Sequence, residues 1–480
     1  MRRRPSPFHV LVAVVAAGTL ASSAAIGLAA GGDDPSPVPG ASSGSGTASS
    51  MPPLPGPELG GQQISGDMRV FGYAYDTGDD IAKVRVDRFR ELYPDVNVSF
   101  SESGWDEQQF LAALAGSAPP DMVNIPRNIL GTYVAKGVLQ PLDGCVASVG
   151  ADMSVFRKPA MDQLTVDGQV YGWPQFYNTR VWLIDDDAWA AAGLDPDSFD
   201  FSDWDAIADA SSKLAKVDGG SFSAIGIDPK MPEFLPLWAH ANGVDLVSAD
   251  GRTSQLDDPR VAEALTFARD LIRSQGDPSA FLDFRGTWDF FGAGNELATH
   301  QVGAFPMEQW YLNVLAENSP DVHITAKPFM TRDGQPMTWE DGDALAIVTG
   351  AANPEAACEF GHVVTAAPTW IAAAQVRADK AAAEGKPQTG VYSGNSDADA
   401  YIFANLVDLS AMPVFRDAVQ VVLDTQDSAF GLPPTPAAAE VDQEFRSAVA
   451  EVLGGGTDAA VALGAADQRA QDAIDGAGGR

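Results

Sequence analysis

The first regular alternation of apolar and polar residues along the chain begins at Met68. Met68–Tyr73 is predicted to be a strand, and Val96–Phe100, in which every second residue is apolar, is predicted to be a second, half-buried strand. Between them, Asp79–Asp80 favours the start of a helix and Pro94 ends it. One face of that helix carries the apolar residues Ala82, Val86, Phe89 and Tyr93. Strand, helix and strand in this order predict a βαβ unit with parallel pairing and a right-handed crossover.

The same pattern repeats further along the chain. We predict a helix over 106–115, a strand over 122–125 and a helix over 129–136. This lobe is therefore expected to be α/β with a mainly parallel sheet. Open sheets of this kind bind ligands beyond the carboxyl ends of their strands. Candidate binding positions at these ends are Tyr73, Tyr75, Asp76, Arg127 and Asn128.

A second α/β region begins after about Trp173. One helix is predicted over 201–216, with Ser202 as its N-cap, and a long amphipathic helix over 259–275. Short strands are predicted at residues 181–184, 225–227, 302–306 and 344–348. No repeat of roughly 20–50 residues is evident, which argues against a solenoid.

The N-terminal segment is predicted to direct export. Arg2–Arg4 precede an uncharged apolar stretch, Val10–Ala30, that ends in small residues, as a cleavable signal peptide does. The stretch is also long enough for an uncleaved membrane anchor with the arginines on the inner side. Residues 1–30 are therefore interpreted as either a signal peptide or an N-terminal anchor. Residues 31–66 are rich in Pro, Ser and Gly and cannot bury enough apolar surface to fold, so we expect a flexible tether there.

Composition narrows the class of partner. With 30 Lys and Arg against 65 Asp and Glu, the 480-residue chain has a formal net charge of −35. A surface this acidic repels phosphate backbones and anionic lipids, so neither nucleic acid nor a lipid surface is expected as a partner. A chain of this length is also expected to divide into two or more domains.

Two cysteines, Cys145 and Cys358, suit an exported protein, in which an even number permits one disulfide. We favour that disulfide, and two separate buried thiols remain the alternative. No metal site is expected, because the five histidines show no i, i+4 pairing and no Cys-x-x-Cys motif occurs. No cofactor is expected either.

Several short motifs follow one another in a fixed order. They are Pro120–Val123 with Gly137–Asp143, Asp167–Pro174, Gly193–Leu194 with Ser202–Trp204, Asn242–Leu246 with Asp250–Gly251, Gln301–Met307 with Trp310, and Ala344–Val348 with Asn353–Phe360. Each is weak alone, but together they resemble family 1 of the extracellular solute-binding proteins of ABC importers, the group that includes maltose- and oligosaccharide-binding proteins. The resemblance covers roughly residues 68–455. It departs from the family pattern at Ala29–Gly32, where no lipidation cysteine occurs, and at Val181–Asp185.

The resemblance implies two α/β lobes of the periplasmic-binding-protein type, with a mainly parallel sheet in each, joined by crossing strands and closing by a hinge motion over a ligand. Lobe 1 is expected to comprise residues 67–175 plus 343–395, and lobe 2 residues 176–342 plus 396–480. The implied function is capture of a small neutral solute, with a mono- or oligosaccharide favoured, and its delivery to an ABC permease and its ATPase. The chain itself is expected to be a monomer without enzymatic activity at the outer face of the cytoplasmic membrane.

A sugar site needs aromatic planes for the ring faces and carboxylates or amides for the hydroxyls. The aromatic candidates are Tyr75, Trp173, Tyr177, Trp238, Trp288, Trp310 and Trp339. The polar candidates are Asp76, Asn128, Gln175, Asn242, Glu308, Asp341 and Asp343. The resemblance places Trp173 and Trp310 beside the binding cleft. Packing in the core is the alternative for each aromatic residue, and a solvated surface position is the alternative for each carboxylate. Asp185–Asp187 is interpreted as the start of a helix.

Two other functions remain open. A secreted carbohydrate-active enzyme would also carry paired carboxylates, although the motifs account for most of the chain and leave no catalytic position. A surface-anchored sensor would keep the same fold and retain the N-terminal segment. The sequence does not identify the solute, and a polyol or a glycerophosphodiester stays a candidate ligand.

Overall fold

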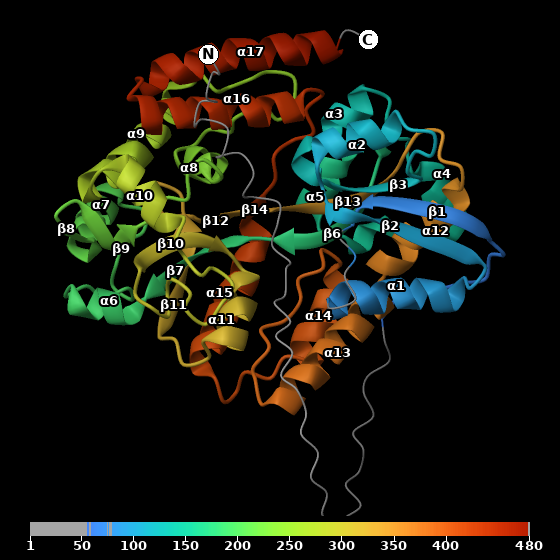
Figure 1. Cartoon of the computed structure of the whole chain (residues 1–480), viewed down its shortest axis with the longest axis horizontal. Coiled ribbons are helices and arrows are strands. Elements are labelled where there is room, and N and C mark those ends of the chain that lie inside the picture. The colour runs from blue at the N-terminus through green and yellow to red at the C-terminus, as the bar shows by residue number, and fades with distance from the viewer. Residues whose placement is uncertain (1–54, 57–58, 74, 76–78, 479–480) are drawn as a thin grey trace, which may run out of the picture. The chain divides into compact units, whose positions relative to one another are not determined.

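Two β-sheets organise residues 55–478, which the computed structural model describes except for 57–58, 74 and 76–78 (Figure 1). One sheet has five strands in the order β2-β1-β3-β13-β6, and the other has seven in the order β14-β12-β11-β7-β10-β9-β8. Each sheet forms the centre of one lobe. The predicted architecture of two α/β lobes is therefore confirmed. The predicted N-terminal signal or anchor, most of the tether and Asp76 lie outside the described residues.

The sheet of lobe 1 combines parallel and antiparallel pairs. Its strands are β1 (Gly66–Gly72), β2 (Val96–Gly104), β3 (Met122–Pro126), β6 (Trp173–Asn178) and β13 (Asp341–Ile347). β1 pairs in parallel with β2 and β3, as the βαβ pattern predicted. β13 runs antiparallel to both β3 and β6. The prediction of a mainly parallel sheet was wrong, because β6 and β13 adjoin the chain crossings instead of following a returning helix.

The sheet of lobe 2 departs further from that prediction. Its strands are β7 (Arg180–Asp185), β8 (Lys216–Asp218), β9 (Ser221–Ile227), β10 (Val302–Glu308), β11 (Ile324–Met330), β12 (Pro336–Trp339) and β14 (Ala429–Phe430). The pairs β9·β10 and β12·β14 are parallel, and the other pairs are antiparallel. A tight turn explains one antiparallel pair. Gly219 and Gly220 join β8 to β9 with positive φ angles of 57° and 87°, which suits a two-residue hairpin.

Helices cover both faces of the lobe 1 sheet (Figure 1). They are α1 (Asp80–Leu92), α2 (Glu107–Leu114), α3 (Leu130–Ala135), α4 (Asp143–Val149), α5 (Lys158–Leu164), α12 (Pro354–Thr365), α13 (Ala367–Glu384) and α14 (Ser396–Asn405). Side chains alternate along β13, so Ala344 packs in the core of α2, α3 and α5, and Leu345 in the core of α1 and α12. A small hairpin, β4 (Thr165–Val166) and β5 (Gln169–Val170), follows α5.

The helices of lobe 2 include the long helix that the sequence predicted without error at either end. They are α6 (Asp186–Ala191), α7 (Trp204–Leu214), α8 (Leu235–Ala241), α9 (Pro259–Gln275), α10 (Pro278–Arg285), α11 (Tyr311–Asn318), α15 (Pro413–Thr425), α16 (Ala438–Ala450) and α17 (Ala459–Gly478). The predicted N-cap of α7 was wrong by one residue. Asp203 caps the helix by accepting from the amides of Asp205 and Ala206, and Ser202 instead donates to Asp200. Asp185 caps α6, which confirms the helix start at Asp185–Asp187.

The chain passes between the two sheets at Thr179, between β6 and β7, and at Glu340, between β12 and β13. Later, α14 packs in the lobe 1 core beside α13, and α15 packs on β11 of lobe 2. The lobe boundaries predicted near residues 175 and 343 lie close to the two crossings, whereas the boundary predicted after residue 395 falls directly before α14, which packs with α13. The domain division as a whole stays a prediction.

Two C-terminal helices contact both lobes. α16 and α17 pack on each other (Figure 1). Thr132 of α3 accepts from the amide of Ala439 at 2.9 Å, and Lys136 pairs with Glu440 at 3.1 Å. On the lobe 2 side, Asp467 of α17 accepts from the amide of Leu256 at 3.1 Å. The C-terminal helices therefore link lobe 2 to α3 of lobe 1.

A disulfide joins Cys145 in α4 to Cys358 in α12, with a Cα–Cα distance of 5.7 Å. This confirms the pairing that the sequence favoured. Within the described part of the chain, no helix combines the length and the apolarity that a membrane crossing requires.

Candidate functional site

Polar side chains gather where the chain crosses between the lobes. Arg180, the first residue of β7, donates to Asp341 at 2.6 Å and to Glu308 at 3.2 Å. Its guanidinium lies 4.2 Å from the centre of the Trp339 ring. Asn178 donates to Asp341 at 3.4 Å. These five residues are called the Arg180 cluster below.

The two crossings and one strand pair bring the Arg180 cluster together. Glu308 lies opposite Arg180 in the antiparallel pair of β10 and β7. Asp341 follows the second crossing and lies opposite Asn178 in the pair of β13 and β6. Residues from both sheets therefore meet at one point, although as many as 163 positions separate them in the chain.

The charges in the Arg180 cluster differ in their access to water. The Arg180 side chain is 2% exposed, whereas those of Glu308 and Asp341 are 19% and 26% exposed. Burial by itself would lower the pKa of Arg180, but the two carboxylates outweigh burial and raise it, so the guanidinium stays charged. The carboxylates are held in place from the buried side and can still accept hydrogen bonds from a bound molecule.

A second arginine, Arg127, is enclosed completely. Its Nη2 lies 2.5 Å from Glu340, and neither side chain is exposed. Its Nη1 donates to the carbonyl oxygens of Gln175, Phe176 and Asp343 at 2.9–3.2 Å. Burial raises the pKa of Glu340 to about 7 in spite of the adjacent guanidinium. Arg127 thus joins the end of β6 to the start of β13, and each of its three nitrogens donates to a group of the protein.

Gly342 allows this junction to form. A Cβ atom at position 342 would lie 2.6 Å from Nη1 of Arg127 and 2.5 Å from the carbonyl oxygen of Phe176. The pairing register between β13 and β6 shifts at this glycine. Any side chain here would separate Arg127 from the first crossing.

Two of the predicted polar residues are engaged with each other inside lobe 1. Gln175 donates to Asn124 at 2.5 Å, and Asn124 donates to Asp343 at 3.1 Å. Arg85 donates to the amide oxygen of Gln175. Burial raises the pKa of the Asp343 carboxyl. This network fixes the strand ends beneath the crossings, and the assignment of Gln175 and Asp343 to a ligand stays a prediction.

Most of the predicted aromatic residues are packed inside the lobes. Trp173, Tyr177, Trp238 and Trp339 are at most 4% exposed. Trp173 stacks on His362, and Trp238 donates to the carbonyl oxygen of Pro229 at 2.9 Å. Both side chains therefore pack in the core in this structure. A ligand contact by either of them stays a prediction.

Trp288 and Trp310 keep part of their surface exposed. Trp310 follows β10 two residues after Glu308 and lies parallel to Phe291, with 6.0 Å between ring centres. Phe291 is 54% exposed. Trp310 is thus a predicted aromatic residue that keeps part of its surface exposed and lies two residues beyond Glu308 in the chain.

The remaining predicted residues lie apart from the Arg180 cluster. Tyr75 stacks on Phe100 with 4.7 Å between ring centres, and Arg90 donates to its hydroxyl. Asn128 belongs to the short helical turn Arg127–Ile129 that precedes α3. Asn242 caps the C-terminal end of α8 and donates to Glu263 at 3.0 Å. Asp76 lies outside the described residues.

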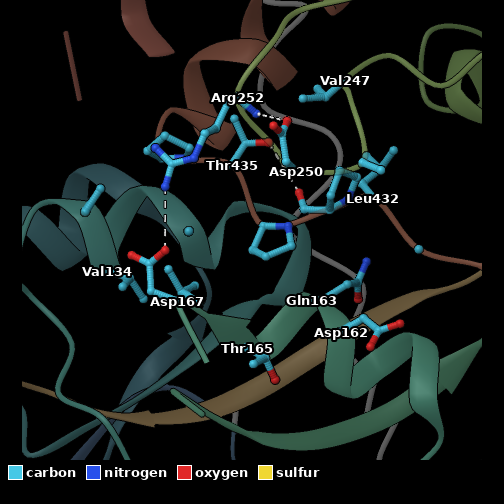
Figure 2. Close-up of a pocket in the computed structure, with 18 of the residues that line it drawn as sticks. Val134, Asp162, Gln163, Thr165, Asp167, Val247, Asp250, Arg252, Leu432 and Thr435 are labelled. Atoms are coloured by element: carbon cyan, nitrogen blue, oxygen red, sulfur yellow. Dashed lines mark hydrogen bonds and ion pairs between the residues drawn. The ribbon is translucent and has the colours of Figure 1, made fainter. Parts of the chain in front are cut away.

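A cavity of about 800 Å³ lies between the lobes and is called the interlobe cavity below. Lobe 1 contributes α3, α5 and the β4–β5 hairpin, and lobe 2 contributes the loop 245–252 and the segment 429–436. Figure 2 shows Val134, Gln163 and Asp167 along one side, and Val247 and Leu432 along the other. None of the described site residues predicted from the sequence lines this cavity.

Neighbouring residues of the second crossing lie near the two regions. A Cβ atom at Gly431, which lines the interlobe cavity, would lie 2.8 Å from Oε1 of Glu340. The next residue, Asp341, pairs with Arg180.

A family model described as bacterial extracellular solute-binding protein matches residues 75–369, more than half of the chain. The chain belongs to this family. The resemblance noted in the sequence is thereby confirmed, and the family is one of binding proteins that work outside the cytoplasm. No curated protein matches this solute-binding protein.

Several solved structures share this fold. CpMnBP1 with mannotriose bound has a TM-score of 0.68 and 20% identity, covering 84% of this chain and 99% of its own. An ABC transporter solute-binding protein from Thermotoga lettingae bound with α-D-tagatose has a TM-score of 0.64, 20% identity and coverages of 85% and 99%. UgpB from Mycobacterium tuberculosis in complex with glycerophosphocholine has a TM-score of 0.61, 19% identity and coverages of 86% and 99%. At these identities the likeness shows the fold.

Four charged residues of this solute-binding protein were not among its predicted site residues. They are Arg180, Glu233, Asp442 and Arg446. On α16, Arg446 donates to Asp442 at 2.6 Å. Burial by itself would lower the pKa of Arg446, but Asp442, Glu233 and Asp341 raise it, which places Glu233 and Asp341 near this guanidinium. Arg180 carried one usable signal, an arginine directly before the strand predicted at residues 181–184. No signal in the sequence pointed to α16 or to Glu233.

One group of possible metal ligands occurs in the described part of the chain, although the sequence predicted none. Single ligand atoms of Asp185, Asp187 and His300 lie within 4.8 Å of one another. Each already has a protein partner: Asp185 caps α6 and contacts His300 at 2.8 Å, and Asp187 contacts His323 at 3.1 Å. These contacts account for the group without a cation.

Proposed function

We propose that this solute-binding protein is the capture component of an ABC importer, that it holds a mono- or oligosaccharide at the Arg180 cluster, and that it delivers the sugar to the permease unchanged. Membership in the family supports the capture role. Similar folds with mannotriose and α-D-tagatose bound support a sugar as the solute.

The observation that carries the proposed site is the arrangement of Glu308 and Asp341. Both carboxylates are fixed on one buried guanidinium, and both keep part of their surface exposed. Sugar hydroxyls donate hydrogen bonds, and a carboxylate acceptor already in position loses little side-chain entropy when it accepts one. Each such bond to a charged group contributes about 1.5–3 kcal/mol.

The position of the Arg180 cluster connects binding to movement of the lobes. Asn178 and Asp341 adjoin the two crossings, and Glu308 belongs to the lobe 2 sheet. A solute bound here contacts the segments whose backbone angles change when the lobes rotate. Closure around the solute then buries it, as in hinge-closing binding proteins generally.

The family argues against catalysis, because its model describes a solute-binding protein. The proposal therefore includes release of the solute intact. Outside the cytoplasm, the protein is secreted or held by its N-terminal segment.

Titration of the full chain with mannotriose, α-D-tagatose and glycerophosphocholine tests the proposed function. We expect one sugar to change the tryptophan emission and to raise the melting temperature, because a ligand that binds only the native state stabilises it. The variant Asp341→Asn should lose this response. Asp270→Asn is the matched control, because Asp270 also accepts from an arginine, Arg269 at 2.8 Å, but lies exposed on α9.

Three outcomes contradict the proposed function. Binding of glycerophosphocholine with no response to either sugar would exclude a sugar as the solute. An undiminished sugar response in Asp341→Asn would exclude the Arg180 cluster. Cleavage of mannotriose during incubation would exclude a pure capture role.

A further inference from the structure

Two aspartates and two histidines meet at the end of strand β7, where α6 begins (Figure 1). Single ligand atoms of Asp185, Asp187 and His300 lie within 4.8 Å of one another, and His323 contacts Asp187 at 3.1 Å. We propose that this group binds one divalent transition-metal ion, such as Zn²⁺. Asp185, Asp187 and His300 are the ligands, and His323 positions Asp187. The proposed metal site is separate from the Arg180 cluster, which adjoins the opposite end of β7.

The strand order of lobe 2 brings these residues together. β10 and β11 both pair antiparallel with β7, so the segments before them lie beside the last residues of β7. Asp185 ends β7, His300 precedes β10 by two positions, and His323 directly precedes β11. Asp185 and His300 are 115 positions apart in the chain. The spacing of the histidines in the sequence therefore gave no indication of a metal site.

The Asp185 carboxylate is held in place by one of its oxygens and faces the group with the other. Oδ1 accepts from the amide of Ala188 at 3.0 Å, which caps α6. Oδ2 lies 2.8 Å from Nδ1 of His300. His300 has a φ of 56°, in the left-handed region that few residues other than glycine adopt. With this backbone, a nitrogen of its ring faces the free oxygen of Asp185.

The group carries two carboxylates without a permanent positive charge. Among the described residues, neither Asp185 nor Asp187 pairs with a lysine or an arginine, and both contact imidazole nitrogens instead. Lys327, on the neighbouring strand β11, pairs with Asp197. Two carboxylates and a neutral imidazole balance the charge of one divalent cation. A proton on a histidine can serve only one pair at a time, whereas one metal ion can bind all three ligands.

The kinds of ligand atom favour a transition metal. Imidazole nitrogen together with carboxylate oxygen suits Zn²⁺, whereas Ca²⁺ and Mg²⁺ prefer oxygen ligands alone. Around a tetrahedral Zn²⁺ with bonds of about 2.0–2.2 Å, neighbouring ligand atoms lie about 3.3 Å apart. The 2.8 Å between Nδ1 of His300 and Oδ2 of Asp185 would therefore grow by about 0.5 Å. His300 is 48% exposed, so little packing opposes that shift.

Hydrogen bonds between these side chains hold the group together when no ion is bound. The ion would replace the contact between His300 and Asp185 and retain the one between His323 and Asp187. Nδ1 of His323 lies 3.1 and 3.3 Å from the two oxygens of Asp187. A contact of this kind orients a metal ligand and adjusts its affinity. Three protein ligands leave the fourth position to water. The bound ion would connect the end of β7 to the segment before β10.

Titration of the full chain with Zn²⁺, without a polyhistidine tag, tests the proposed metal site. Calorimetry should show one Zn²⁺ per chain, and the melting temperature should rise, because the ion binds only the assembled group. His300→Asn should weaken binding at least about tenfold, since losing even an outer partner of a ligand costs about 10- to 100-fold. Asparagine also tolerates a left-handed φ.

His240→Ala is the matched control and should leave Zn²⁺ binding unchanged. Nδ1 of His240 likewise lies 2.6 Å from an aspartate, Asp245, but within the described part of the chain this pair belongs to no group of three ligands. Asp187→Asn removes a second ligand from a side chain that is 56% exposed, so it should weaken binding without unfolding the protein. His323→Ala should weaken binding less than His300→Asn.

Several results of these titrations would overturn the metal site. One is a wild-type chain that neither binds Zn²⁺ nor melts at a higher temperature in its presence. Another is undiminished binding in both His300→Asn and Asp187→Asn, and a third is an equal loss in His240→Ala. Binding of Ca²⁺ as tight as that of Zn²⁺ would exclude the histidine as a ligand. In crystals soaked with Zn²⁺, the anomalous signal should lie between Asp185, Asp187 and His300, and a signal elsewhere would contradict the proposal.

Discussion

Two arginines stand at the crossings between the lobes, and their surroundings differ. Arg127 is enclosed with Glu340 and with three backbone carbonyl oxygens, so every hydrogen that it donates is used within the protein. Arg180 is buried as well, but its two carboxylates, Glu308 and Asp341, retain contact with solvent.

The difference separates a structural ion pair from a recognition site. A buried pair with no exposed atom can stabilise one arrangement of the chain but cannot contact a solute. Carboxylates that are fixed on one side and exposed on the other can accept hydrogen bonds from a solute at little cost in entropy. Exposure of the anionic partners, rather than burial of the arginine, is what distinguishes the two regions.

The largest effect is expected from Arg127→Ala. This change leaves Glu340 buried without its partner and three carbonyl oxygens without a donor, so the free energy of unfolding should fall by about 3–5 kcal/mol. Urea denaturation followed by circular dichroism measures the loss. Arg180→Ala should cost less, because Glu308 and Asp341 can be hydrated. Equal losses in the two variants would remove the distinction between the two arginines.

The pH dependence of stability should follow Glu340. Its pKa is about 7 in the folded chain, above the ordinary value of 4.5, so the folded state holds the proton more tightly than the unfolded state. The resulting stability is complete below pH 4.5 and is lost as the pH rises through 7. Glu340→Gln cannot ionise, and the decrease in unfolding free energy between pH 5 and pH 8 should shrink by about 2–3 kcal/mol.

Urea titrations at several pH values between 5 and 8 measure this slope. Glu296→Gln is a useful control, because burial also raises the pKa of Glu296 to about 7 in a region away from the crossings. Each variant should remove its own share of the slope. A slope in Glu340→Gln equal to that of the wild type would show that this carboxyl ionises normally.

Asp341→Asn should affect binding rather than folding. It weakens acceptance by a partly exposed carboxylate, so we expect sugar affinity to fall about 10- to 100-fold, equivalent to roughly 1.5–3 kcal/mol. The unfolding free energy should change by less than about 1 kcal/mol. Isothermal titration calorimetry and urea denaturation on the same preparation measure both quantities. A variant that unfolds easily but binds normally would reverse the roles given to the two arginines.

The smallest effect is expected from Trp310→Ala. Trp310 keeps an exposed face two residues beyond Glu308, and an aromatic contact with a sugar ring contributes about 0.5–1.5 kcal/mol beyond burial. Sugar affinity should fall about 2- to 10-fold. Trp288→Ala is the matched comparison, because that side chain is also partly exposed but does not adjoin the Arg180 cluster in the sequence. Equal effects of the two changes would show that Trp310 has no special position.

Local patterns in the sequence determined much of the secondary structure. The stripe of Ala82, Val86 and Phe89 predicted α1, and α9 was predicted from Pro259 to Gln275 as observed. These elements could be predicted because hydrophobic periodicity and helix caps act over a few residues. The order of the short motifs further identified the family and the two-lobed fold.

Only the tertiary structure decided how the sheets are completed and which polar residues meet. β13 joins the lobe 1 sheet antiparallel to β3, more than 200 positions away, so the mainly parallel sheet predicted from the βαβ units was wrong. Arg180, Glu308 and Asp341 are likewise far apart in the chain. Trp173 was predicted as a ligand contact because tryptophan suits sugar rings and the resemblance places it beside the cleft; in this structure it packs against Gly361 and is buried, and the ligand contact stays a prediction. Such contacts depend on how distant segments pack, and no local pattern in the chain records that.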